Sequence, residues 1–140
     1  MTIKIHNALC TGCKSCEVVC SASHVGQFNP ERSRIRVVNK ATEGESRIAV
    51  CRLCPNPACV KACTYEACTK DETANVIRVD YEACVGCYAC VEACPFHAIF
   101  IDPVEHVPLI CDHCGGDPTC VKFCYQKAIH SETDVSRPPE

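Results

Sequence analysis

Sixteen of the seventeen cysteines in this chain of 140 residues fall into four groups of four. The first and third groups read C-x2-C-x2-C-x3-C, whereas the gap between the second and third cysteines is longer in the other two. The groups are Cys10, Cys13, Cys16 and Cys20; Cys51, Cys54, Cys59 and Cys63; Cys84, Cys87, Cys90 and Cys94; and Cys111, Cys114, Cys120 and Cys124. Cys68 lies outside them. Cysteines in such a pattern indicate metal or redox chemistry.

Three cysteines at positions i, i+3 and i+6 suit one kind of centre, the 4Fe-4S cluster. Each of its four iron atoms takes one thiolate, and a short loop with this spacing can wrap three of them. The fourth thiolate must come from elsewhere, and in two-cluster ferredoxins the fourth cysteine of each run ligates the other cluster. The spacing therefore predicts 4Fe-4S clusters.

Two other uses of the cysteines stay open at this point. A structural zinc module needs only two cysteines per C-x2-C knuckle, so the third cysteine of the first and third groups would have no role in it. A disulfide framework is typical of exported proteins, and the first ten residues lack the apolar run of a secretory signal. The second and fourth groups alone are weaker signals for clusters, so iron and acid-labile sulfide per chain decide the count.

The order of the four groups also carries a resemblance to a known family. Residues 4–129 resemble the polyferredoxin-like, four-cluster electron-transfer subunits of molybdenum or tungsten pterin oxidoreductases, the aldehyde oxidoreductase and formate dehydrogenase types. The motifs that carry it are residues 10–20, 51–59, 84–95 and 111–120. The resemblance implies an α+β fold of tandem bacterial-ferredoxin-like lobes, with short strands and short helices around 4Fe-4S clusters.

In that family the first group pairs with the fourth and the second with the third, and each group lends its last cysteine to its partner. The resemblance thus implies four clusters. Their ligands would be Cys10, Cys13, Cys16 and Cys124 (cluster 1); Cys51, Cys54, Cys59 and Cys94 (cluster 2); Cys84, Cys87, Cys90 and Cys63 (cluster 3); and Cys111, Cys114, Cys120 and Cys20 (cluster 4). Only Cys94 is followed by the family's usual proline, so we expect a looser turn after the last cysteine of the other groups.

The implied function is electron transfer, with no catalytic residue in this chain. The implied partner is a large catalytic subunit, a tungsten or molybdenum pterin enzyme of the aldehyde oxidoreductase type, and the second redox partner is a ferredoxin, a flavin subunit or a hydrogenase. Alternatives are the iron-sulfur subunit of a formate dehydrogenase, a hydrogenase or a tungsten acyl-CoA reductase, a free ferredoxin-like carrier, and a structural zinc-binding module. End-to-end stacking of copies is a further expectation.

Short β-branched stretches indicate the strands that position the cysteine groups. We expect strands around residues 3–5, 35–38, 48–50, 76–79 and 98–101, and brief helices over the last cysteine of each group, such as 89–94 and 119–124. The expected domains are residues 1–47 and 103–130, the two halves of an outer lobe; residues 48–102, an inserted second lobe; and residues 131–140, a polar C-terminal tail.

Composition limits the remaining function classes. The formal charge of -3, with no basic block, argues against nucleic-acid binding. No run approaches the ~20 apolar residues that a membrane span needs, so we expect no membrane span and a cytoplasmic location. Cysteine accounts for about a quarter of the 47% hydrophobic content and Trp is absent, so we expect cluster binding to supply folding free energy.

The residues outside the cysteine groups are given ordinary roles. Cys68 is expected to be a buried bystander thiol. The histidines, including His24, have no mutual spacing for a metal site, and His113 is expected to be a solvated loop residue. Aromatic residues near the cysteine groups, such as Tyr65 and Tyr125, are expected to shield clusters from water.

Overall fold

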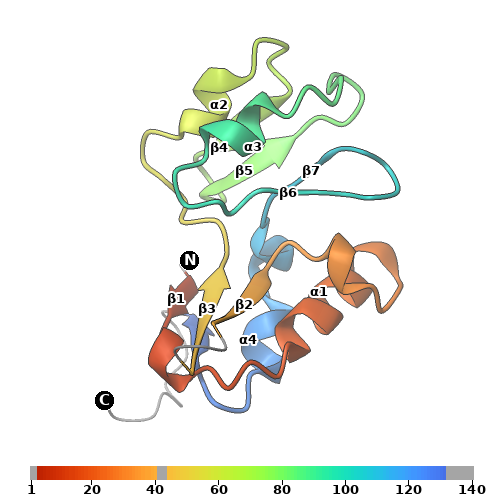
Figure 1. Cartoon of the computed structure of the whole chain (residues 1–140). Helices are drawn as coiled ribbons and strands as arrows, with labels where there is room; N and C mark the ends of the chain where they lie inside the picture. Colours follow the sequence, from red (N-terminus) through yellow and green to blue (C-terminus); the bar gives the residue numbers. More distant parts are fainter. Residues whose placement is uncertain (1–2, 41–43, 132–140) are drawn as a thin grey trace.

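The computed structural model describes residues 3–40 and 44–131, and its elements gather into two halves (Figure 1). One half is built around two packed helices, α1 (Ser15–Val25) and α4 (Thr119–Phe123). The other is built around α2 (Ala58–Ala62) packed on α3 (Ala89–Ala93). Each half therefore joins helices from two cysteine groups that are distant in the sequence.

Within the described residues, four antiparallel pairs of short strands complete these halves. They are β1 (Ile3–Ile5) with β8 (Ile129–Ser131), β2 (Arg36–Lys40) with β3 (Glu45–Ala49), β4 (Cys68–Asp71) with β5 (Val76–Val79), and β6 (Phe100–Ile101) with β7 (Pro108–Leu109). Three 3-10 turns, η1 (Asn7–Leu9), η2 (Pro30–Arg32) and η3 (His113–Gly116), connect them. The pairing of β1 with β8 brings the two ends of the described chain together.

Most expected strands are present, with differences at their ends. The strand expected over 98–101 covers only its last two residues, and β4, β7 and β8 were not expected. Ser131, placed at the start of the tail, instead pairs with Ile3, while residues 132–140 lie outside the described chain. Helix α1 is eleven residues long rather than brief, because it continues past Cys20 until Gly26, whose φ of 71° ends it.

Two small apolar cores hold the halves, and cysteines make up part of both. The core under α1 and α4 contains Ile35, Ile48 and Ile129, together with buried cysteines from the first and fourth groups. The core under α2 and α3 is smaller and centres on Ile77, Ile99 and Ile110. Aliphatic packing is therefore thin, as the composition predicted.

A buried ion pair ties the loop after α1 to the β6–β7 hairpin. The guanidinium of Arg32 donates to both carboxylate oxygens of Asp102 at 3.0–3.2 Å, and the two side chains are only 12% and 3% exposed. The backbone NH of Val104 also donates to Asp102. Burial opposes ionisation of Asp102, but these donors outweigh it and lower the pKa, so the stabilisation is lost as the pH falls through about 4 and below.

We expect Asp102→Ala to destabilise the holoprotein by about 3 kcal/mol, because it leaves the Arg32 charge buried without a partner. The measurement is the temperature at which the visible cluster absorption is lost on anaerobic heating, which should fall. Arg78→Gln is the matched control, since the Arg78–Asp71 pair lies at the surface and should leave that temperature unchanged. Equal temperatures for Asp102→Ala and the unmodified chain would contradict the role of the pair.

Candidate metal centres

All seventeen cysteines are free thiols, and sixteen of them lie in four sets in space. The sets follow the nested order that the resemblance implies, and we number them as above. Set 1 is Cys10, Cys13, Cys16 and Cys124; set 2 is Cys51, Cys54, Cys59 and Cys94; set 3 is Cys63, Cys84, Cys87 and Cys90; and set 4 is Cys20, Cys111, Cys114 and Cys120.

Sets 1 and 3 each line a cavity. The four thiols of set 1 surround a cavity of about 170 Å³ between the start of α1 and residues 124–129. The thiols of set 3 line a smaller cavity of about 20 Å³, which Cys68 also lines. Burial, and then the charges of Glu17, Cys10 and Cys124, raise the pKa of Cys16 to about 12.

Sets 2 and 4 have no exposed cysteine: the four cysteines of set 2 are half-buried, and three of the four in set 4 are buried. Burial, followed by the charges of Cys51 and Cys94, raises the pKa of Cys59 to about 11. In set 4, burial and then the neighbouring thiolates raise the pKa of Cys120, and burial raises that of Cys111 to about 12. Buried thiols that repel one another as thiolates need a compensating positive charge, which a metal centre supplies.

The four sets form a row, in the order 1, 4, 2, 3. The negative charge of Cys16 in set 1 contributes to the raised pKa of Cys120 in set 4. The charge of Cys51 in set 2 likewise contributes to the raised pKa of Cys111 in set 4, so set 4 lies next to both sets. Cys59 of set 2 lies near Cys68, beside set 3. Only Cys13 and Cys87 among the cysteines are exposed, and they belong to the two ends of this row.

The loop that starts each cysteine group has the same backbone feature in all four groups. The residue two positions after the first cysteine has a positive φ between 53° and 76°. These residues are Gly12, Leu53, Gly86 and His113. At Gly12 a side chain would also collide with Asn39, because a Cβ would lie 2.6 Å from its amide oxygen. Left-handed backbone is strained at non-glycine residues such as Leu53 and His113, and such strain is common at functional sites. The two longer groups therefore begin with the same type of loop as the two short groups, despite the strain.

The turn after the last cysteine is also repeated. The third residue after Cys63, Cys94 and Cys124 is left-handed in each case, with φ between 52° and 55°, and the next residue is a buried alanine. The backbone NH of that alanine donates to the cysteine sulfur at Cys63 and Cys94, at 3.3 and 3.5 Å. The expectation of looser turns without proline is therefore wrong for Cys63 and Cys124, because the left-handed residue makes the turn. The repeated C-x3-A pattern was the sequence signal for it.

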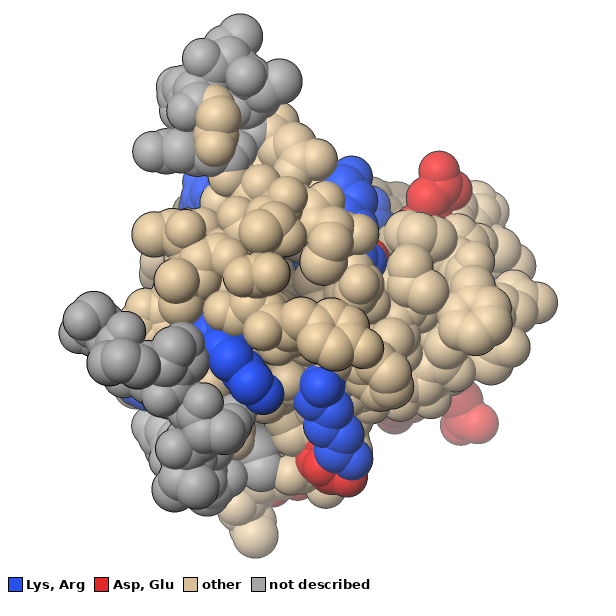
Figure 2. Space-filling view, turned by 90° about the horizontal axis from the view of Figure 1, so that it is seen from below, with Lys and Arg blue, Asp and Glu red and all other residues tan. Residues whose placement is uncertain are grey.

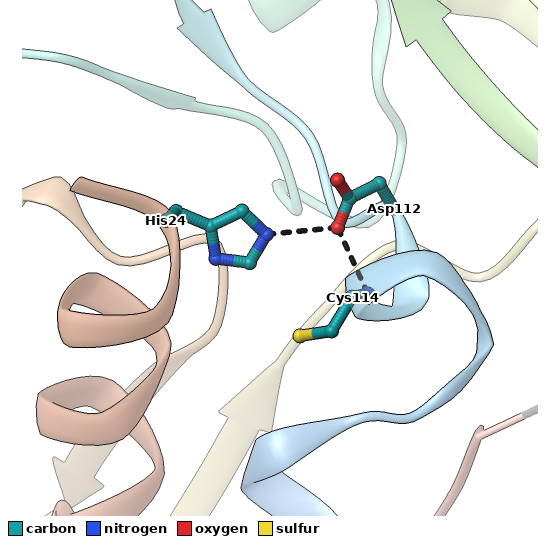
Figure 3. Close-up of side chains that lie close together, drawn as sticks. All are labelled: His24, Asp112 and Cys114. Atoms are coloured by element: carbon teal, nitrogen blue, oxygen red, sulfur yellow. Dashed lines mark hydrogen bonds and ion pairs between the residues drawn. The ribbon is translucent and has the colours of Figure 1, made fainter. Parts of the chain in front are cut away.

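His24, given an ordinary role from the sequence, instead connects the two segments that supply set 4 (Figure 3). Its Nε2 lies 2.8 Å from Asp112, and its Nδ1 lies 2.8 Å from the Cys20 carbonyl oxygen and 3.7 Å from the Cys20 sulfur. The Asp112 carboxylate raises the pKa of His24 to about 10. The same carboxylate accepts the backbone NH of Cys114 at 2.9 Å. Helical spacing of four residues between Cys20 and His24 was the available signal.

Two other expectations are corrected by side-chain positions. His113 is buried, with 2% exposure, rather than solvated, because it lies in the loop that carries Cys111 and Cys114. The expected shielding by aromatic residues is only partial: Tyr125 and Tyr65 line the cavities of sets 1 and 3 but are 89% and 53% exposed, and Phe123 is 47% exposed.

The donor chemistry fits 4Fe-4S clusters. Each set offers four thiols, three from one loop and one from the paired group, which is the ligand supply that such clusters use.

Models of the 4Fe-4S binding domain match residues 7–23 and 77–100. The polyferredoxin-like subunit of an aliphatic sulfonate oxidoreductase from Pyrococcus furiosus is 42% identical over 117 residues, covering 84% of this chain and 67% of that protein. The thiosulfate reductase electron transfer subunit PhsB of Salmonella typhi is 32% identical, covering 91% of this chain and 75% of that protein.

This chain belongs to the polyferredoxin-like 4Fe-4S electron-transfer subunits. Such a subunit carries electrons within an oxidoreductase complex and is not a catalyst alone, as predicted. A chain of the active site complex BamBC of benzoyl coenzyme A reductase has a similar structure, with a TM-score of 0.55 and 30% identity over 98% of this chain and 81% of that one. The α+β, ferredoxin-like fold class is confirmed. Within residues 3–40 and 44–131, no helix has the length and apolar character to cross a membrane.

Proposed function

We propose that this polyferredoxin-like subunit holds four 4Fe-4S clusters, one on each thiol set, and relays single electrons between a catalytic subunit and a second redox partner. A bound cluster supplies one-electron oxidation and reduction at a potential tuned by hydrogen bonds to sulfur and by exposure. The observation that carries the proposal is the row of sets 1, 4, 2 and 3, with exposed Cys13 at one end and exposed Cys87 at the other.

The two ends of the row are the proposed docking sites. At the set 1 end, Phe123 and Tyr125 flank Cys124 and are 47% and 89% exposed. At the set 3 end, Val85 and Tyr65 are 59% and 53% exposed beside Cys84 and Cys63. Figure 2 shows the underside of the molecule in Figure 1 as mostly uncharged, with scattered basic and acidic side chains. Exposed apolar side chains around an end thiol suit contact with a partner protein.

The proposed catalytic partner is a tungsten or molybdenum pterin enzyme of the aldehyde oxidoreductase type. A tungsten aromatic acyl-CoA reductase is the second candidate, favoured by the similarity to a chain of the benzoyl coenzyme A reductase complex. The proposed domains remain an outer lobe, residues 1–47 with 103–130, around sets 1 and 4 and an inserted lobe, residues 48–102, around sets 2 and 3. We propose that the subunit works in the cytoplasm.

The test is anaerobic purification of the subunit from its source with whatever it binds. We expect about sixteen iron and sixteen sulfide atoms per chain, and a large co-purifying subunit that contains tungsten or molybdenum. Aldehydes and aromatic acyl-CoA thioesters, offered with a redox dye, separate the two candidate partners. A colourless, zinc-containing sample would contradict the cluster proposal, and a large subunit without either metal would contradict the proposed partner.

A further inference from the structure

Cys68, the cysteine outside the four groups, lies at the wall of set 3. It is the first residue of β4, where it pairs with Val79 of β5, and it is only 3% exposed. Its side chain lines the same cavity as Cys63, Cys84, Cys87 and Cys90. Five thiols therefore surround a site for which four are ligands in our proposed function.

The contacts of Cys68 identify it as a hydrogen-bond donor rather than a bystander. Its thiol lies next to the thiols of Cys90 and Cys63 on the wall of this cavity, within reach of a hydrogen bond. Cys68 and Cys90 pack in the same buried cluster. In our proposed function Cys90 is a thiolate ligand without a proton, so a hydrogen bond between the two sulfurs must be donated by the Cys68 thiol. Cys68 thus presents S–H to a sulfur that is held as thiolate.

The repeated turn after the last cysteine supplies an internal comparison. Cys68 is the fifth residue after Cys63, and the equivalent residues after Cys94 and Cys124 are Ile99 and Ile129, buried at 5% and 1% exposure. An apolar side chain therefore serves at this position in the other two turns. Only beside set 3 does the position carry a donor that can reach a ligand sulfur.

We propose that Cys68 is a positioning residue that donates a hydrogen bond to the Cys90 sulfur and so raises the reduction potential of the cluster on set 3 relative to a site without this donor. This proposal rests on the proposed ligand role of set 3. The physical reason is that reduction adds negative charge to the cluster and its sulfurs, and a hydrogen bond stabilises the more negative state.

The experiment compares Cys68→Ala, Cys68→Ser and Ile99→Ala with the unmodified holoprotein, all purified anaerobically. Iron and sulfide are counted, and each cluster is titrated by electron paramagnetic resonance at controlled potentials. We expect full iron in all four proteins. In Cys68→Ala, one cluster should show about a tenfold lower ratio of reduced to oxidised form at a fixed potential, a shift of about 59 mV to more negative values.

The serine variant should return that midpoint toward its original value, because a hydroxyl group can also donate to the Cys90 sulfur. Ile99→Ala removes buried volume without removing a donor and should leave the same midpoint unchanged. Unshifted midpoints in Cys68→Ala, or equal shifts in the alanine and serine variants, would overturn the proposal. Loss of one cluster's iron in Cys68→Ser would make Cys68 a ligand and overturn it too. An unmodified chain without iron would instead contradict the proposed function.

Discussion

Removal of iron under anaerobic conditions is expected to unfold most of this chain. In residues 3–40 and 44–131, three of the four α-helices are five residues long and each sheet has only two strands, so neither kind of element is stable without tertiary contacts. The core that should supply those contacts is partly made of cysteines such as Cys16, Cys111 and Cys120. Without metal, these buried thiols lose the bonds that hold the loops together.

The measurement is the far-ultraviolet circular dichroism spectrum and the pattern of limited proteolysis before and after chelation. We expect loss of most of the helical signal and cleavage throughout residues 3–131. Anaerobic addition of iron and sulfide should restore both, which serves as the control against irreversible damage. A spectrum and cleavage pattern that survive complete iron removal would show that aliphatic packing alone holds the fold.

Replacement of Cys111 by Ser is expected to interrupt electron transfer along the whole subunit. Cys111 lies in set 4 and also next to Cys51 of set 2, at the middle of the row. Its loss should remove one cluster, about a quarter of the iron, and leave a gap between sets 1 and 2. Reduction of the second partner by the catalytic subunit should fall to the rate measured without this chain.

The matched control for that variant is Cys68→Ser, which replaces a buried cysteine outside the four sets. This control protein should keep the full iron content and the full rate of electron transfer. Cys13→Ser is the second test. Because Cys13 is exposed at the end of the row, its replacement should disturb folding less than the replacement of the buried Cys111. We expect this end variant to lose one cluster and transfer to the partner at that end. Full iron content in Cys111→Ser would contradict the assignment of Cys111 as a ligand.

Features fixed by nearest neighbours in the chain could be predicted from the sequence. The cysteine spacing indicated the cluster loops, and the β-branched stretches indicated β1 and β5, because loops and hairpins depend on residues close together. The same locality explains one missed feature, the turn after the last cysteine. The C-x3-A repeat was visible in the sequence. The left-handed residues in it are Glu66, His97 and Lys127, and none of them is the glycine that usually indicates such a turn.

By itself, the sequence determined the chemistry of this protein: sixteen thiols in a ligand spacing, a resemblance to a family of electron-transfer subunits, and few aliphatic residues for a core. The tertiary structure decided the order of the four thiol sets in a row, the contact of Cys68 with Cys90, and the bond of His24 to Asp112 across 88 residues. These depend on which distant segments pack together, and packing between α1 and α4 or α2 and α3 is set by burial of the whole chain rather than by any local pattern.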